Sequence, residues 1–318
     1  MNPRLIEYLE NSFLGDYLKK ENITDISYNG KNFFYMDNIL GRKKLPLDIP
    51  HSEVLDFVRQ IANLGEKQFS YSEPILDFSV SKYRINAVHT SISRYLDDKV
   101  VSFCIRIASS KNRIDKTFAT KEMFEYIFDL IKNEESIIIA GATGSGKTEL
   151  QKYLLSRFED NTRIIVIDNV QELECLREYD NLDLTSWQVS NQNSFELLIR
   201  NALRSNPDWL IISESRGKEM SDILLSVMSG HPIITTIHAY NVEEIPSRIT
   251  RLVLKSSDNQ KYEDVYKDVV AHFKNYIYLK RHIMKNGKVV RYISSIGRYD
   301  EKTKKVIKKF ERKKYEEN

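Results

Sequence analysis

The sequence contains little cysteine. Only Cys104 and Cys175 occur among 318 residues, and they form no CxxC pair. Neither a disulfide framework nor a zinc site is therefore indicated. Because both cysteines lie in apolar surroundings, we expect them to be small buried side chains.

Long apolar runs are also absent. No stretch of the sequence approaches the roughly 18 consecutive apolar residues of a membrane-spanning helix. Residues 1–7 become acidic and amphipathic too early for a signal peptide. We therefore expect a cytoplasmic protein.

The excess of charge of one sign is small. The net charge is +3, which is too little to indicate nucleic-acid binding. Residues 299–318 are more basic, with eight Lys and Arg against five acids. A solvated edge hairpin and tail is the favoured interpretation of this segment, and a contact with an anionic membrane or a nucleic acid is the alternative.

The length predicts about two domains, on a scale of ~150 residues each. Residues 1–110 favour an α+β domain, with a helix over 53–64 and strands over 25–28, 75–80, 83–88 and 100–107. Residues 111–117 are polar and are predicted to be a linker. In residues 118–318 apolar strands alternate with helical patterns, which predicts an α/β domain with a mostly parallel sheet, followed by C-terminal helices and a hairpin.

A glycine-rich segment follows the apolar run over 137–140. It reads Gly141-Ala142-Thr143-Gly144-Ser145-Gly146-Lys147-Thr148, and the helical pattern begins directly after it, with Glu149 in the first turn. Glycines leave room for a phosphate and let successive backbone N–H groups point inward at a helix N-terminus. The sequence therefore predicts a phosphate-binding loop, in which Lys147 reaches the β- and γ-phosphates of ATP and Thr148 binds Mg²⁺.

Polar residues follow the other predicted parallel strands of this domain, at the edge of the sheet where ligands bind. Glu214 ends the strand over 209–212 and suits an acid that holds Mg²⁺ or its water shell. Glu172 lies five residues after Ile167, within reach of an attacking water, and His238 ends the strand over 232–237. On their own, the last two are more often a solvated glutamate and a histidine bonded to the backbone.

Taken together, four motifs resemble one family, the hexameric secretion ATPases of type IV secretion, conjugation, and type II secretion or pilus systems. The family has a phosphate loop, an aspartate box, a second-strand box and a histidine box in that order. Here they occupy residues 141–149, 163–173, 203–216 and 229–239. The resemblance implies a RecA-like C-terminal domain, a mixed α/β N-terminal domain, a ring of six subunits and a nucleotide between the two domains.

The resemblance also implies roles for single residues. Glu172 matches the catalytic glutamate, Glu214 the glutamate on the Mg²⁺ side, and His238 the histidine that couples nucleotide state to movement. Arg84 and Arg106 resemble the paired arginines of the N-terminal domain, which would reach the phosphates. Their alternative is pairing with Asp77, Asp97 or Asp98.

Several positions depart from the family pattern. Asn169 stands where an acid is usual, Ser213 and Ile233 stand where glycines are usual, and Glu149 stands where a second threonine is usual. Asn169 cannot supply an anionic charge, and Glu149 would repel a phosphate if its carboxylate pointed inward. These changes are compatible with slow hydrolysis.

Three functions follow as hypotheses. The leading one is an ATP-hydrolysing ring motor at the cytoplasmic face of the membrane, which works with inner-membrane components of a secretion, conjugation or pilus apparatus. The second is a RecA-like ATPase that translocates DNA or RNA, although direct nucleic-acid binding is not indicated by the dispersed basic residues. The third is a nucleotide-gated scaffold with little hydrolysis, for which Asn169 and Ile233 are the support.

Overall fold

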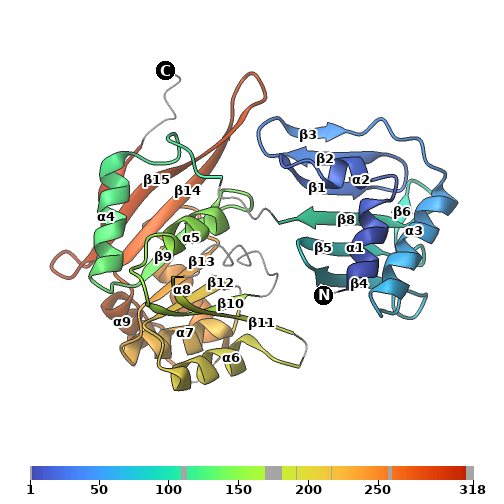
Figure 1. The fold of residues 1–318 in the computed structure, drawn as a ribbon. Coiled ribbons are helices and arrows are strands. Elements are labelled where there is room, and N and C mark those ends of the chain that lie inside the picture. Colours follow the sequence, from blue (N-terminus) through green and yellow to red (C-terminus); the bar gives the residue numbers. More distant parts are fainter. Residues whose placement is uncertain are drawn as a thin grey trace. The chain divides into compact units, whose positions relative to one another are not determined.

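The computed structural model describes residues 2–108, 113–168, 181–190, 192–215, 217–256 and 260–312. The chain divides into two compact units (Figure 1). The first holds Met1–Ser110 with Ile283–Val289, and the second holds Lys111–His282 with Val290–Asn318. The segment Ile283–Val289 thus groups with the first unit, whereas the sequence placed it in the second domain. The domain boundaries given above otherwise stay a prediction.

The first unit is an antiparallel sheet with helices packed against it. The strands lie in the order β3-β2-β1-β8-β5-β4, and each pair of neighbours is antiparallel. Apolar residues of the three helices share one core with the sheet. The elements are α1 (Pro3–Glu10), α2 (Gly15–Leu18), β1 (Ile23–Tyr28), β2 (Phe33–Asp37), β3 (Gly41–Lys44), α3 (His51–Leu64), β4 (Ile75–Val80), β5 (Tyr83–Val88) and β8 (Ser102–Ile107), with a small ribbon of β6 (Arg94–Tyr95) and β7 (Asp98–Lys99).

The second unit contains an eight-stranded sheet in the order β11-β10-β12-β13-β9-β14-β15-β16. The strands from β11 to β14 are parallel, and β16 runs antiparallel to β15. The strands are β9 (Ile137–Gly141), β10 (Arg163–Asp168), β11 (Asp183–Gln188), β12 (Trp209–Glu214), β13 (Ile233–Ile237), β14 (Asn275–Ile283), β15 (Val289–Asp300) and β16 (Lys305–Glu311). The helices are α4 (Lys121–Lys132), α5 (Lys147–Leu155), α6 (Phe195–Ala202), α7 (Glu219–Met228), α8 (Ile245–Val253) and α9 (Tyr262–His272).

Helices cover both faces of this sheet. Strand residues alternate between two cores, so that Ile137 and Ile139 pack with α4 and α5 on one face, and Ile138 packs with residues of α6 to α9 on the other. Burial on both faces explains why the central strands are continuous apolar runs. The prediction of a mostly parallel α/β unit preceded by an α+β unit is confirmed.

Besides the two-residue strands β6 and β7, two strands were not predicted from the sequence. β3 and β11 are edge strands, and most of their side chains are exposed or half-buried. An edge strand buries too little apolar surface to show a clear apolar pattern. β16 is also an edge strand, which agrees with the edge-hairpin interpretation of the basic segment for residues 299–312.

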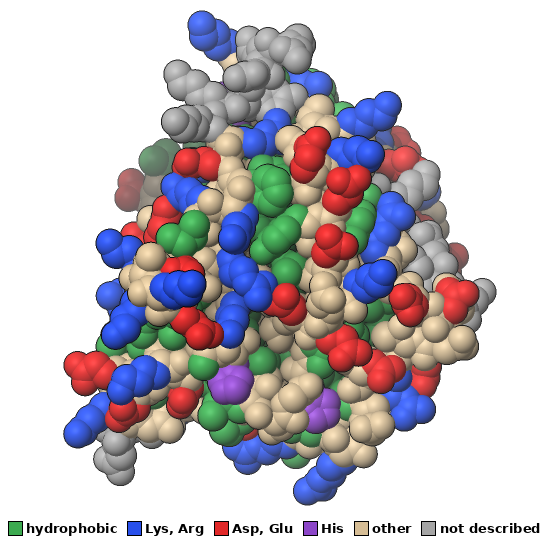
Figure 2. All heavy atoms as spheres, turned by 90° about the vertical axis from the view of Figure 1, so that its left-hand side faces the viewer, with side chains coloured by type: hydrophobic (Ala, Val, Ile, Leu, Met, Phe, Trp, Pro, Cys, Tyr) green, Lys and Arg blue, Asp and Glu red, His purple; other side chains and the backbone are tan. Residues whose placement is uncertain are grey.

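None of the helices in the described ranges combines the length and the apolar character that a membrane span requires. Figure 2 shows one face of the molecule, on which Lys and Arg side chains alternate with Asp and Glu side chains. The described residues of this face therefore form no large basic patch.

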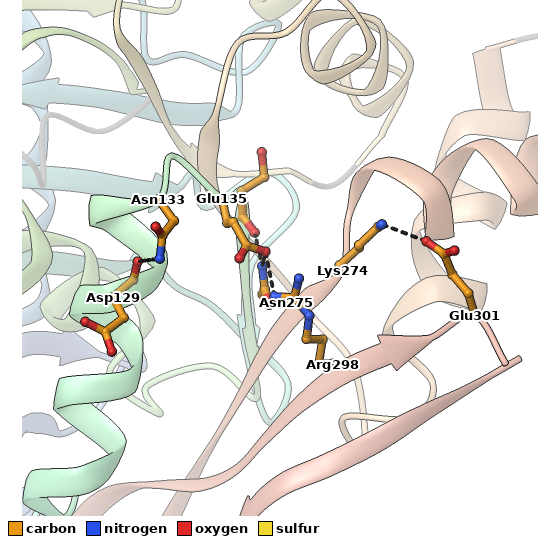
Figure 3. Close-up of polar contacts among 8 residues, drawn as sticks. Asp129, Asn133, Glu135, Lys274, Asn275, Arg298 and Glu301 are labelled. Atoms are coloured by element: carbon orange, nitrogen blue, oxygen red, sulfur yellow. Dashed lines mark hydrogen bonds and ion pairs between the residues drawn. The ribbon is translucent and has the colours of Figure 1, made fainter. Parts of the chain in front are cut away.

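A polar network fixes the end of the second sheet that lies at the start of β9 (Figure 3). The buried Asn275 donates to Glu135 Oε2 at 3.0 Å and to the Ser136 carbonyl oxygen at 3.3 Å, and it accepts from Arg298 at 2.7 Å. Arg298 also contacts Glu135 at 2.5 Å. The amide thus joins the residues that precede β9 to the strands β14 and β15.

Replacing Asn275 by leucine is expected to lower the free energy of unfolding by about 1–3 kcal/mol, because three polar partners lose their hydrogen bonds. The control is Lys274→Gln, which removes the more exposed Lys274–Glu301 pair and should cost less than about 1 kcal/mol. Urea unfolding followed by tryptophan fluorescence measures both, because Trp187 and Trp209 both lie in the second unit. Equal transition midpoints for the two variants would contradict the structural role of Asn275.

Candidate active site

The phosphate loop connects β9 to α5 and depends on its glycines. Gly144 and Gly146 have φ angles of 72° and 98°, in the left-handed region that favours glycine. At Gly141 an added Cβ atom would lie 2.6 Å from Ser145 Oγ and 2.7 Å from the Leu279 carbonyl oxygen. Packing leaves no room for a side chain at Gly141, and the left-handed φ angles would strain any other residue at Gly144 and Gly146.

Lys147 is the first residue of α5, and its side chain folds back over this loop. Its ammonium donates to the carbonyl oxygens of Gly141 at 3.0 Å and Ala142 at 3.2 Å. The residue is only 8% exposed. The loop therefore holds a positive charge close to its own backbone amides, as phosphate binding requires.

Glu214 reaches the site through an irregularity in β12. In the pairing of β12 with β13, Ile212 faces Thr235 and Glu214 faces Thr236, so that Ser213 is an extra residue. Such a bulge bends a strand and changes the direction of the next side chain. The extra residue Ser213, at a position where the family pattern has glycine, thus sets the direction of the Glu214 side chain.

His238 joins Glu214 to the phosphate loop. It follows β13, its Nδ1 lies 3.0 Å from the Gly141 carbonyl oxygen, and its Nε2 contacts Glu214 Oε1. A carbonyl oxygen only accepts hydrogen bonds, so Nδ1 carries a proton. His238 therefore lies between the loop backbone and the Glu214 carboxylate.

Lys147, Glu214 and His238 meet because their strands are near neighbours in the sheet order β12-β13-β9. The carboxyl ends of these parallel strands lie at one edge, and the Gly141 carbonyl accepts from both Lys147 and His238. The arrangement combines a loop for phosphate, an ammonium, a carboxylate and an imidazole. These groups suit the binding and transfer of a phosphoryl group.

Comparison with known proteins agrees with this chemistry. The family model described as "Type II/IV secretion system protein" matches residues 87–271. An uncharacterized protein of Bacillus anthracis is 30% identical over 93% of this chain and 70% of its own length. The chain belongs to the type II/IV secretion system protein family.

Two further likenesses fit this membership. The type IV secretion system protein VirB11 of Bartonella quintana is 25% identical over 76% of this chain and 79% of its own length. The ATPase DotB of Legionella pneumophila shares the fold, with a TM-score of 0.64 and 19% identity over 95% of this chain and 81% of that chain. The protein has the RecA-like fold of this class and is a nucleotide-binding secretion ATPase.

The secretion ATPase has a glutamate after Thr148, and the structure shows how that charge is accommodated. Glu149 Oε2 accepts from the Arg113 backbone N–H at 3.0 Å, and Oε1 contacts the buried Lys152 at 3.4 Å. The carboxylate is therefore engaged with the chain that leads into α4 and with its own helix. The N–H group and the ammonium offset part of the negative charge of this carboxylate.

The paired arginines of the first unit lie directly opposite each other, Arg84 on β5 and Arg106 on β8. Arg84 donates to both carboxylate oxygens of Asp77 at 3.3 and 3.2 Å, which was the alternative interpretation of this residue. Arg106 contacts Asp25 at 3.7 Å, a partner that the sequence reasoning did not consider. Two like charges opposite each other destabilise a sheet unless acids offset them. Asp77 and Asp25 do so here.

Four further positions were considered in the sequence motifs, and the structure describes two of them, Asp168 and Ile233. Glu172 and Asn169 lie outside the described residues. Asp168, which ends β10, is buried and was not among the predicted site residues. Ile233 begins β13, at the strand end away from His238, and it is fully buried in the core, so its position gives no reason for slow hydrolysis.

Proposed function

We propose that this secretion ATPase is a subunit of a ring motor that uses ATP hydrolysis to power substrate transfer or pilus assembly at a membrane secretion or conjugation complex. One observation carries the proposal. The Gly141 carbonyl accepts from Lys147 and His238, and His238 contacts Glu214, so residues of three motifs lie in one bonded group. A hydrolytic motor needs such a connection between its phosphate site and the groups that respond to it.

In this proposal each residue has a role at the triphosphate. Lys147 and the backbone amides of the loop hold the β- and γ-phosphates, and Glu172 polarises the attacking water. His238 exchanges its contacts when the γ-phosphate leaves, and Arg84 and Arg106 bind phosphate oxygens. Pairing with Asp77 and Asp25 orients the two guanidinium groups.

The donor atoms of the site suit Mg²⁺. Thr148 supplies a hydroxyl oxygen and Glu214 a carboxylate oxygen. Asp168 adds a second carboxylate at the end of the neighbouring strand β10. Hard oxygen ligands of this kind are those that Mg²⁺ prefers, together with phosphate oxygens and water. When bound, the ion neutralises charge that develops on the phosphates. The protein's part is to orient Thr148 and Glu214 on adjacent elements.

We further propose that the working form is a hexameric ring at the cytoplasmic face of the membrane, where inner-membrane components of the apparatus receive the work. The relative from Bartonella quintana carries the name of a type IV secretion system protein, which supports this choice of apparatus. The sequence similarity extends over most of both chains.

The test is ATP hydrolysis by the purified protein with and without Mg²⁺. Chelation of the metal is expected to reduce the rate at least about tenfold, because the phosphate charge is then not neutralised. An excess of Mg²⁺ over the chelator should restore the rate. Single-stranded DNA at low and high salt is expected to leave the rate unchanged, since a nucleic-acid motor would show strong salt-sensitive stimulation. Metal-independent turnover would count against the proposal.

A further inference from the structure

Three arginines surround the phosphate loop although none belongs to the four motifs. Arg113 precedes α4, Arg281 lies on β14 and Arg291 lies on β15. Arg113 is far in the sequence from the other two, and the sheet order β9-β14-β15 places Arg281 and Arg291 beside the strand that leads into the loop. All three belong to the second unit.

Arg291 and Arg281 approach the loop at its glycines. Arg291 Nε donates to the Gly144 carbonyl oxygen at 2.8 Å. A Cβ atom added to Gly144 would lie 3.4 Å from an amino nitrogen of Arg281, and one added to Gly146 would lie 3.6 Å from Arg291 Cδ. The two guanidinium groups therefore lie against the loop that binds phosphate.

The hydrogen bond from Arg291 fixes the direction of a loop amide. In a trans peptide the C=O of one residue and the N–H of the next point in opposite directions. With the Gly144 carbonyl directed to Arg291, the Ser145 N–H points the other way, where it donates to the Ala142 carbonyl at 3.2 Å. Arg291 thus stabilises the turn over residues 142–145 without being part of the loop.

Two further arginines act electrostatically on Arg291. Burial, and then the neighbouring Arg281 and Arg113, lower the pKa of the Arg291 guanidinium, and Glu149 opposes this effect. Glu149 is already shared with Lys152. Arg281 and Arg113 thus add positive charge close to Arg291 and the loop, which favours the approach of a polyanion.

We propose that Arg281 and Arg291 are nucleotide-binding determinants of this ATPase: Arg291 is a positioning residue that orients the loop through the Gly144 carbonyl, and Arg281 adds charge that attracts the polyphosphate of a nucleoside triphosphate. The inference rests on the proposed function, because it takes the phosphate loop to bind Mg²⁺-ATP. It assigns part of the affinity to a hairpin outside the four motifs.

The experiment compares Mg²⁺-ATP binding by calorimetry and steady-state ATP hydrolysis for the full chain and its variants. Arg281→Gln is expected to weaken binding about threefold to tenfold at low salt, and high salt should reduce this difference because the group is exposed. Arg291→Met is expected to weaken binding about tenfold, through loss of a charged hydrogen bond. KM should rise in both variants, with a smaller change in kcat.

Two further variants separate charge from position. Lys280→Gln removes one positive charge from the adjacent position of β14, whose side chain points to the opposite face, and should stay within about twofold of the wild type. Arg291→Lys keeps the charge but not the planar guanidinium. Its binding of Mg²⁺-ATP should depend on salt as that of the wild type does, but with a lower affinity. If Arg291→Met does not fold, as judged by tryptophan fluorescence, the exposed Arg281 still provides the test.

The outcomes distinguish this inference from the proposed function. If Arg281→Gln binds Mg²⁺-ATP as Lys280→Gln does, and Arg291→Lys behaves as the wild type, the inference is wrong while the function stands. If the wild type itself does not bind Mg²⁺-ATP, or if Lys147→Ala binds equally well, both are overturned. A loss of affinity confined to the Arg281 and Arg291 variants, with Lys280→Gln unchanged, supports the inference.

Discussion

Lys147→Ala is expected to reduce ATP hydrolysis at least about a hundredfold, since the removed ammonium is a preorganised donor to the charge that develops in the transition state. The structure gives the reason for so large an effect. Two carbonyl oxygens, those of Gly141 and Ala142, hold the buried ammonium in place, so it need not reorganise when a phosphate binds. Release of inorganic phosphate measures the loss.

A matched control removes a lysine elsewhere in the same unit. Lys132 is exposed at the end of α4, and Lys132→Ala should hydrolyse ATP within about twofold of the wild type. Urea unfolding followed by tryptophan fluorescence shows whether each variant is folded. Undiminished turnover in folded Lys147→Ala would remove the basis for the phosphate loop as the site of hydrolysis.

Glu214→Gln is the second change with a large expected effect. It preserves the size of the side chain and its reach to His238 but removes the negative charge that a bound Mg²⁺ would need. We expect kcat to fall about a hundredfold, while ATP binding changes only a few-fold, because binding depends mainly on the loop. Single-turnover hydrolysis and calorimetric titration with ATP separate the two quantities.

The pairing of Glu214 with His238 sharpens this test. If the two side chains act as one unit, the double variant Glu214→Gln, His238→Gln should be hardly slower than the slower single variant. If the fold-reduction in rate of the double variant equals the product of the two single reductions, the two side chains act independently. Glu125→Gln on the exposed side of α4 is the control and should keep normal turnover.

The sequence predicted the parts of the site that are contained in single segments. The phosphate loop, Glu214 and His238 each follow a buried strand, and a buried parallel strand has a recognisable apolar pattern. The features that the sequence did not predict depend on which residues are paired between neighbouring strands. The extra residue at Ser213 is visible only in the pairing with β13, and the contact of Arg106 with Asp25 only in the pairing with β1.

The arginines near the loop illustrate the same limit. Arg281 and Arg291 occupy ordinary strand positions, and nothing in their local sequence marks them. They approach Gly144 because β14 adds in parallel to β9 and β15 lies beyond it. In β11, likewise, half-exposed residues gave no apolar pattern, although pairing with β10 makes it a strand. Contacts between distant segments, and edge strands, are set by the tertiary structure.

The bond between Glu149 and the Arg113 backbone has a mechanical consequence. The amide end of α5 receives the phosphates, and its first turn is tied by this carboxylate to the chain that enters α4. If that helix end rotates or shifts when a phosphate binds or leaves, the backbone at position 113 must move with it, or the hydrogen bond must break. The glutamate that replaces a threonine here is thus a tether between the catalytic helix and the preceding chain.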